Sequence, residues 1–186
     1  MTLFTGKGDD GTTKTFDSKP GERISKASAI SEALGTLDEL NSFLGLSKVE
    51  SEKHSFTISG RAFGKVVHDI QENLFTIQAE LVGAEKTIAK EKLRECEAYI
   101  YDAEKELPPI TTFFISGGTE LAAQFDVART LARRAERRVV AVVECNKREI
   151  GEWSRAYLNR LSSLLYALAR LSNHKSGISE ESPKYE

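Results

Sequence analysis

Cysteine, histidine and proline are scarce in this sequence, and its charges almost cancel. The 186 residues include two cysteines, Cys96 and Cys145, and three histidines in unrelated contexts, with no CxxC pair. Thiols so few and so far apart argue against a disulfide framework or a zinc site, and both are predicted to be ordinary intracellular thiols. The formal net charge of −2 gives no overall electrostatic basis for binding nucleic acid or a membrane surface.

Long apolar runs are missing as well. No stretch approaches the length of about 20 residues that a membrane-spanning helix needs, and the N-terminus lacks the apolar core of a signal peptide. A hydrophobic content of 40% over 186 residues is sufficient for one core. We therefore expect a single domain covering residues 1–186, located in the cytoplasm, with neither nucleic acid nor a membrane as a partner.

Only four prolines occur, two of them adjacent at positions 108 and 109, which leaves room for long helices. Apolar residues recur at a spacing of three to four in five stretches: 30–44, 63–81, 93–103, 121–139 and 157–171. This periodicity predicts five amphipathic helices and an all-α bundle. Residues 110–118 read as an extended or loop segment. The polar tail, 175–186, is predicted to be flexible.

Five arginines and one glutamate occupy residues 129–138, which read RTLARRAERR. On a helix, Arg129, Arg133 and Glu136 fall within roughly 60° of one another, and Arg137 lies beside them. Arg134 and Arg138 point away from that stripe. One interpretation is a solvated face with ion pairs between successive turns, and the run taken alone favours it. The other is a site for an anion carrying several phosphates.

A loop of small polar residues precedes the first helix and reads TGKGDDGTTKT over residues 5–15. Such a loop can present successive backbone N–H groups and hydroxyls to phosphate oxygens. It is not a Walker A loop, because the GxxxxGK[ST] spacing is absent and no strand precedes it. The alternative is a disordered N-terminal tail. The presence of one phosphate loop and one arginine helix in the same chain favours a polyphosphate site.

Three further positions carry polar or aromatic side chains that require an explanation. Asp38 lies at the edge of an apolar stripe, where a carboxylate needs a partner, while the neighbouring Glu39 fits a solvated face. Asn159 is either a surface residue or an amide that reaches a ligand. Phe113 and Phe114 precede a glycine pair and are either core anchors or a wedge beside a flat ligand.

Several segments together resemble the PduO-type ATP:cob(I)alamin adenosyltransferases. They are TGKGDDGTT, Lys26, SEALGTLDELNSFLG, FFISGGT, ARTLARRAERR and YLNRLSSLLYALAR, in that order. The resemblance runs from about residue 4 to about residue 172. It implies a ferritin-like, cobalamin adenosyltransferase-like five-helix bundle that assembles as a homotrimer, with active sites between subunits.

The resemblance also implies roles for particular residues. The N-terminal segment, residues 1–20, would form the ATP-binding loop. Asp38 would pair across the interface with Arg129, and Phe113 would lie against the corrin and displace its lower axial ligand. These three residues and Arg133 would form the catalytic set. The implied ATP contacts are Thr5, Gly6, Lys7, Gly8, Asp9, Gly11, Thr12, Thr13, Lys14, Lys26, Arg133, Arg134, Glu136, Arg137 and Asn159.

The implied chemistry is displacement at carbon, in which cobalt(I) attacks the 5′ carbon of ATP and triphosphate leaves. Mg²⁺ is expected on the ATP phosphates with no dedicated protein site, and cobalamin is the substrate that supplies the nucleophile. A reductase and an adenosylcobalamin-dependent acceptor enzyme are the expected partners. The alternatives are a phosphotransferase and a non-catalytic trimeric helical protein that binds nucleotide or carries cobalamin.

Three positions depart from the common pattern of the family. Ser116 stands where a proline commonly precedes the glycine pair, and Asp126 stands where a histidine often precedes the core of the arginine helix. Ser163 replaces an aspartate that often follows LNRLS. These departures leave the phosphate contacts named above in place and concern the corrin side of the site.

Overall fold

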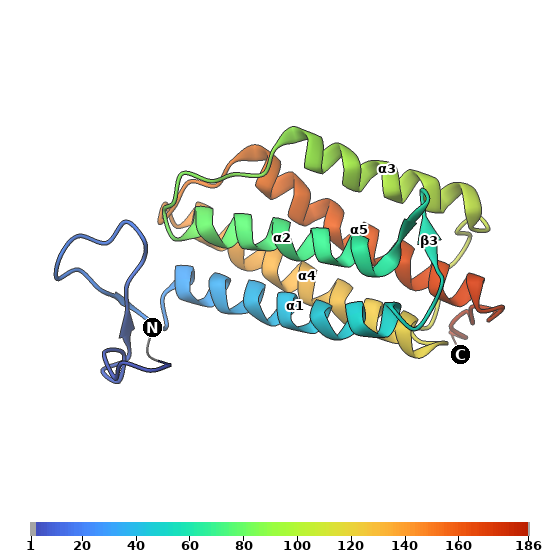
Figure 1. The fold of residues 1–186 in the computed structure, drawn as a ribbon, viewed down its shortest axis with the longest axis horizontal. Coiled ribbons are helices and arrows are strands. Elements are labelled where there is room, and N and C mark those ends of the chain that lie inside the picture. Colours follow the sequence, from blue (N-terminus) through green and yellow to red (C-terminus); the bar gives the residue numbers. More distant parts are fainter. Residues whose placement is uncertain (1–2, 186) are drawn as a thin grey trace.

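The structure, a computed structural model, describes residues 3–185. Five helices lie side by side in one bundle (Figure 1): α1 (Ala29–Ser51), α2 (Phe63–Leu81), α3 (Lys90–Glu106), α4 (Glu120–Glu144) and α5 (Glu152–Lys175). The prediction of an all-α five-helix bundle is confirmed. No helix within residues 3–185 is long and apolar enough to cross a membrane.

Local sequence signals explain where several helices begin and end. The hydroxyl of Ser28 accepts from the backbone N–H of Ser31 and caps α1, and Thr119 caps α4 in the same way, at 3.1 Å from the nitrogen of Ala122. Such caps satisfy backbone donors that have no partner inside the helix. The helix α3 ends at Glu106, one residue before the proline pair, which cannot continue it.

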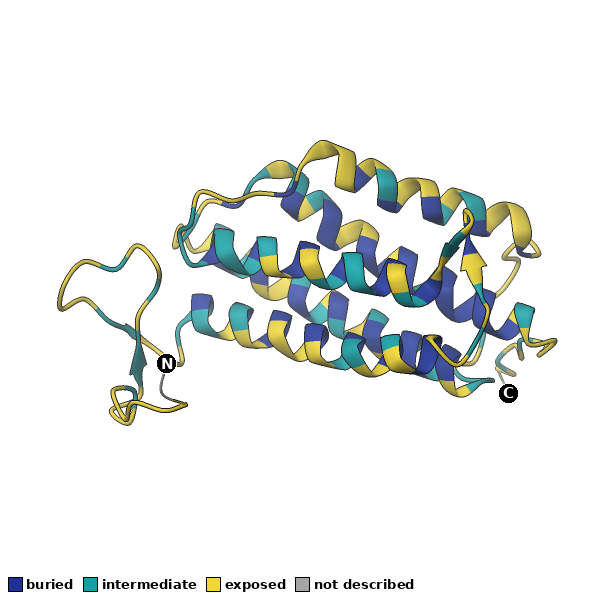
Figure 2. Cartoon of the chain, viewed as in Figure 1, coloured by how far each residue is buried: buried dark blue, intermediate teal, exposed yellow. Residues whose placement is uncertain are grey.

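The core lies between the inward faces of the helices, as Figure 2 shows. The central helix α4 packs against α1 and α5, while α2 packs against α1 and α3 against α5. Leu37, Phe63, Phe125 and Tyr157 are almost completely buried there. Burying a leucine-sized side chain contributes about 2 kcal/mol, so these apolar stripes supply the main driving force for assembly of the bundle.

Two small antiparallel strand pairs were not predicted from the sequence. One joins β3 (Thr57–Ile58) to β4 (Arg61–Ala62) in the connection between α1 and α2. The other joins β1 (Thr12–Thr13) to β2 (Ile24–Ser25) within the N-terminal segment. Strands of two residues carry no alternating apolar pattern, so periodicity cannot reveal them.

The two ends of the bundle carry different irregular segments. The N-terminal segment lies beyond the end where α1 begins, and the C-terminus lies at the opposite end (Figure 1). The tail after Lys175 contacts the loop before α4, where the backbone N–H of Ile115 donates to the carbonyl of Glu181 at 2.8 Å. This contact does not report the motion of the tail, so the flexibility expected for residues 175–186 stays a prediction.

Candidate functional site

The arginine cluster lies on α4 and divides between two sides of that helix. On the side of α1, Arg134 pairs with Glu39, and Arg138 Nε lies 3.3 Å from Glu32 Oε1. Arg129 and Arg133 lie on the other side, where they line a cavity. This division follows from the helical angles predicted for the cluster. Arg134 already has a carboxylate partner in the protomer, and its ATP contact stays a prediction.

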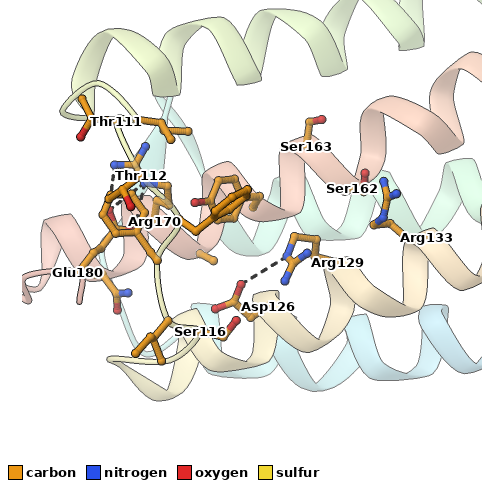
Figure 3. Close-up of a pocket in the computed structure, with 17 residues that line it drawn as sticks. Thr111, Thr112, Ser116, Asp126, Arg129, Arg133, Ser162, Ser163, Arg170 and Glu180 are labelled. Carbon is orange, nitrogen blue, oxygen red and sulfur yellow. Dashed lines mark hydrogen bonds and ion pairs between the residues drawn. The ribbon is translucent and has the colours of Figure 1, made fainter. Parts of the chain in front are cut away.

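The cavity has a volume of about 610 Å³ and lies at the end of the bundle where α4 begins and α5 ends. Figure 3 shows Arg129, Arg133 and Asp126 on α4, next to the helix α5 that carries Ser162, Ser163 and Arg170. The segment from Ile110 to Ser116, including Phe113, forms a further wall. A cavity of this size with cationic and aromatic walls suits an organic ligand bearing negative charge.

Arg129 is held within the cavity by a carboxylate and an aromatic ring. Its Nε lies 3.5 Å from Asp126 Oδ1, and its guanidinium carbon lies 5.8 Å from the centre of the Tyr166 ring. The other oxygen of Asp126 accepts from the backbone N–H of Gly117 at 3.2 Å. Burial raises the pKa of Tyr166, so its phenol stays neutral beside the cation. Asp126 therefore connects Arg129 to the loop.

Glu136 and Asn159, two predicted ATP contacts, meet between α4 and α5. The Nδ2 of Asn159 donates to Glu136 Oε1 at 2.8 Å, and the Oδ1 of Asn159 accepts from Arg160 at 2.7 Å. The guanidinium of Arg137 donates to the backbone carbonyl of Arg133 at 3.1 Å. The structure thus places four of the predicted ATP residues on one stretch of the α4 and α5 surface.

Phe113 is 77% exposed and lines the cavity. Its neighbour Phe114 instead lies beneath the guanidinium of Arg170, with 5.0 Å between the guanidinium carbon and the ring centre. The sequence left two interpretations of this aromatic pair open. Phe114 therefore fits the interpretation as a packed anchor, and Phe113 fits the interpretation as an exposed wedge beside a ligand. Exposure of so large an apolar side chain inside a cavity marks a surface available for ligand contact.

Arg170 organises the loop that presents Phe113 and was not among the residues predicted from the sequence. The side chain is only 4% exposed. It donates to Glu180 in the tail, with its Nε 2.8 Å from Oε2, and to the carbonyl of Pro108 at 3.2 Å. A carboxylate partner and a backbone carbonyl thus offset the cost of burying this guanidinium.

Asn173 is a second missed residue, at the end of the same helix. Its Oδ1 accepts from the backbone N–H of Thr119 at 2.9 Å, and its Nδ2 donates to the carbonyl of Gly117 at 2.8 Å. Both Arg170 and Asn173 interrupt the apolar stripe of α5, where a buried polar side chain requires a partner. That interruption was the available sequence signal.

The N-terminal loop is exposed and is held mainly by its own hydrogen bonds. Lys26 Nζ donates to the carbonyl of Gly8 at 2.7 Å, and Arg23 donates to the carbonyls of Lys7 and Thr12 at 2.6 and 2.9 Å. Arg23 was not among the predicted residues. The described part of this loop contributes no lining residue to the cavity and makes no hydrogen bond to Arg129 or Arg133. One protomer therefore does not bring the loop and these arginines together.

Asp38 lies in a second, shallower hollow of about 520 Å³ between α1 and α2. The lining is mainly apolar and includes Leu34, Ala79 and Phe75, which is 58% exposed. Within residues 3–185, no hydrogen bond or ion pair involves the Asp38 carboxylate, and Arg129 pairs with Asp126 instead. The predicted pairing of Asp38 with Arg129 is thus not made within one subunit.

No group of three or more histidine, cysteine, aspartate or glutamate side chains suited to a metal ion occurs in the described part of the chain. The cationic side chains that line the cavity are the guanidinium groups of Arg129, Arg133 and Arg170. Guanidinium donors match phosphate oxygens in charge and geometry.

Comparison with known proteins identifies related sequences and folds. The family model for cobalamin adenosyltransferase matches residues 3–172. The corrinoid adenosyltransferase of Bacillus subtilis is 39% identical over 191 residues, covering 97% of this chain and 91% of that protein. The corrinoid adenosyltransferase PduO of Citrobacter freundii is 37% identical over 182 residues, covering 94% of this chain. The chain spans 50% of the length of that relative.

The fold is similar to that of solved structures. A variant PduO-type ATP:corrinoid adenosyltransferase from Lactobacillus reuteri, complexed with cobalamin and ATP, superposes with a TM-score of 0.86 at 25% sequence identity. The match covers 99% of this chain and 97% of the other. The similarity therefore includes all five helices and the N-terminal segment.

Proposed function

Because the chain belongs to the cobalamin adenosyltransferase family, we propose that it transfers the 5′-deoxyadenosyl group of ATP to the cobalt of cob(I)alamin and releases triphosphate. The observation that carries this proposal is the cavity in which the exposed ring of Phe113 shares the lining with Arg129 and Arg133. An apolar ring suits the flat face of a corrin, and guanidinium groups suit phosphates. The cavity thus supports one site for both substrates.

The reaction is a displacement in which the protein need not supply a nucleophile. The cobalt(I) electron pair forms a bond to the 5′ carbon of ATP, the bond from that carbon to the triphosphate oxygen breaks, and triphosphate departs with those electrons. Arg133, Lys7 and Lys26 would stabilise the charge that accumulates on the leaving oxygens. Mg²⁺ would accompany the phosphates and neutralise part of the same charge.

A complete site requires more than one subunit in this proposal. Two observations support it: the N-terminal loop does not reach Arg129 or Arg133 within a protomer, and Asp38 faces a mainly apolar hollow without a partner in residues 3–185. Pairing Asp38 of one subunit with Arg129 of the next would satisfy that carboxylate. We propose that the assembly is the homotrimer implied by the resemblance.

The cellular setting is also a proposal. Both cysteines are free, which supports a reducing compartment such as the cytoplasm. A reductase would supply the low-valent cobalt, and an adenosylcobalamin-dependent enzyme would accept the product.

The test combines the protein with ATP, Mg²⁺ and chemically reduced cobalamin. We expect a light-sensitive cobalt–carbon product and one equivalent of triphosphate. Release of orthophosphate or pyrophosphate in place of triphosphate would contradict the mechanism. Binding of both ligands with no product would favour the non-catalytic carrier.

A further inference from the structure

Asp17, at the base of the N-terminal loop, attaches this loop to connections between helices at one end of the bundle. Arg148, in the connection between α4 and α5, donates from Nη1 to Asp17 Oδ2 at 2.7 Å and from Nη2 to Oδ1 at 3.1 Å. The hydroxyl of Thr15 donates to the same carboxylate at 2.8 Å. Two parallel bonds from one guanidinium fix the direction of a carboxylate as well as its distance.

A glycine in the connection between α2 and α3 provides the space that Asp17 occupies. Gly83 has a φ of +90°, and a Cβ at this position would lie 2.5 Å from the carboxyl carbon of Asp17. The backbone N–H of Phe16 also donates to the carbonyl of Val82 at 2.9 Å. Three segments distant in sequence therefore converge on one carboxylate.

This attachment differs from the other contacts of the loop. Arg23 and Lys26 bond to carbonyls of the loop itself, so they shape the loop without fixing its position on the bundle. Asp17 and Phe16 instead bond to residues of two helix connections. The contact at Asp17 is thus placed to determine where the loop lies relative to the helices.

We propose that Asp17, Gly83 and Arg148 form a latch that positions the N-terminal loop to bind ATP. This inference rests on the proposed function. The three residues lie outside the cavity and act as positioning residues through the loop. Without the latch, the loop is free to adopt other arrangements. Part of the free energy of ATP binding is then used to order the loop, so the affinity for ATP falls.

Loss of the ion pair between Asp17 and Arg148 should affect the position of the loop more than the unfolding free energy of the protein. The side chains of Asp17 and Arg148 are 43% and 22% exposed, and exposed ion pairs contribute little to unfolding free energy. Loss of the latch is therefore expected to change the loop and not the bundle. Hydrogen bonds from Arg148 and Thr15 lower the pKa of Asp17 to about 2. The latch consequently persists at neutral pH and is lost only as the pH falls toward that value.

The test uses Asp17→Asn, Arg148→Gln and the double variant in the full chain. Asp102→Asn is the matched control, because Asp102 is another exposed carboxylate that accepts from a cation, Lys105, at 2.9 Å. Tryptic cleavage after Lys14 is followed without ATP, and KM for ATP and kcat are measured separately.

We expect faster cleavage in both single variants, an increase in KM for ATP of about fivefold, and unchanged kcat at saturating ATP. The double variant should resemble each single variant, since both remove one interaction. Cleavage and KM equal to those of Asp102→Asn, or additive effects in the double variant, would overturn the latch. The cleavage assay needs no turnover, so failure of the proposed function would show separately, as a wild-type chain with an intact latch and no product.

Discussion

The side-chain amide of Asn159 in α5 donates a hydrogen bond of 2.8 Å to the carboxylate of Glu136 in α4. The amide oxygen of Asn159 in turn accepts from Arg160. Each group therefore has a fixed direction before any ligand arrives. In the proposed ATP site, such preorganisation reduces the cost of binding because the side chains need not be ordered by the nucleotide.

Asn159→Ala should therefore weaken ATP binding. The change removes one hydrogen-bond donor to Glu136 and one proposed nucleotide contact, and a loss of about 1 kcal/mol corresponds to a rise in KM for ATP of about fivefold. Arg138→Ala is the control, because Arg138 pairs with Glu32 on the opposite side of α4. Equal KM values in the two variants would remove Asn159 from the ATP site.

The sequence predicted the five helices because their buried residues recur every three to four positions. The apolar pattern of the first helix stops at residue 44, whereas α1 continues to Ser51 through Ser47, Glu50 and Ser51, which are buried although polar. The Ser51 hydroxyl donates to the carbonyl of Ser47 at 2.6 Å, so the helix itself satisfies this buried polar side chain. Polar residues with such local partners are invisible to a hydrophobic pattern.

The sequence predicted the directions of site residues that lie along one helix. It did not predict the contacts that depend on the path of a loop. The angles along α4 correctly separate Arg129 and Arg133 from Arg134 and Arg138. The contacts of Asp126 with Gly117, and of Asn173 with Thr119, depend on how the loop before α4 folds back. No spacing rule encodes that path.

Arg129→Ala should reduce assembly or activity. In the proposed trimer, Arg129 meets Asp38 of a neighbouring subunit, and removing one partner leaves a carboxylate at an interface without compensation. Sedimentation and adenosyl transfer measure the two effects, and Asp38→Asn should reproduce them. If neither quantity changes in Arg129→Ala, the proposed pairing is wrong.

Gly118→Ala should destabilise the fold more than Gly117→Ala. Both glycines have positive φ, +102° and +121°, so both substitutions introduce backbone strain. A Cβ at Gly118 would also lie 2.4 Å from Asn173 Oδ1, whereas one at Gly117 would meet no atom within 4 Å. Displacing Asn173 breaks its bonds to Thr119 and Gly117.

The difference in unfolding free energy between these two variants should be about 1–3 kcal/mol. Denaturant unfolding of the purified proteins measures it. Equal losses would mean that Asn173 can move aside without a cost in stability.

The two thiols should differ sharply in reactivity. Cys96 is 2% exposed, and burial raises its pKa to about 12, so almost no reactive thiolate forms at pH 8. Cys145 is exposed. Iodoacetamide should therefore add one group to the native protein, at Cys145, and two in denaturant, as read by mass spectrometry. A Cys145→Ser variant that still takes up one group under native conditions would contradict the burial of Cys96.

Phe113→Ala tests which substrate the exposed ring serves. In the proposed reaction, the ring lies against the corrin and keeps cobalt without its lower axial ligand, which makes reduction from cobalt(II) easier. Phe113 is 77% exposed on the cavity wall, so its removal should not disturb the core. ATP affinity should stay unchanged, whereas product formation that starts from cob(II)alamin and a reductant should fall by more than tenfold, equivalent to about 1.4 kcal/mol.

The control for this variant is Tyr101→Ala, which removes another exposed ring, 61% exposed, from α3 outside the cavity. It should alter neither quantity. A reaction started from chemically prepared cob(I)alamin should be affected less by Phe113→Ala, because the reduction step is bypassed. If ATP affinity and turnover fell together in Phe113→Ala, the ring would be acting on the nucleotide or on the loop that carries it, and its assignment to the corrin would be rejected.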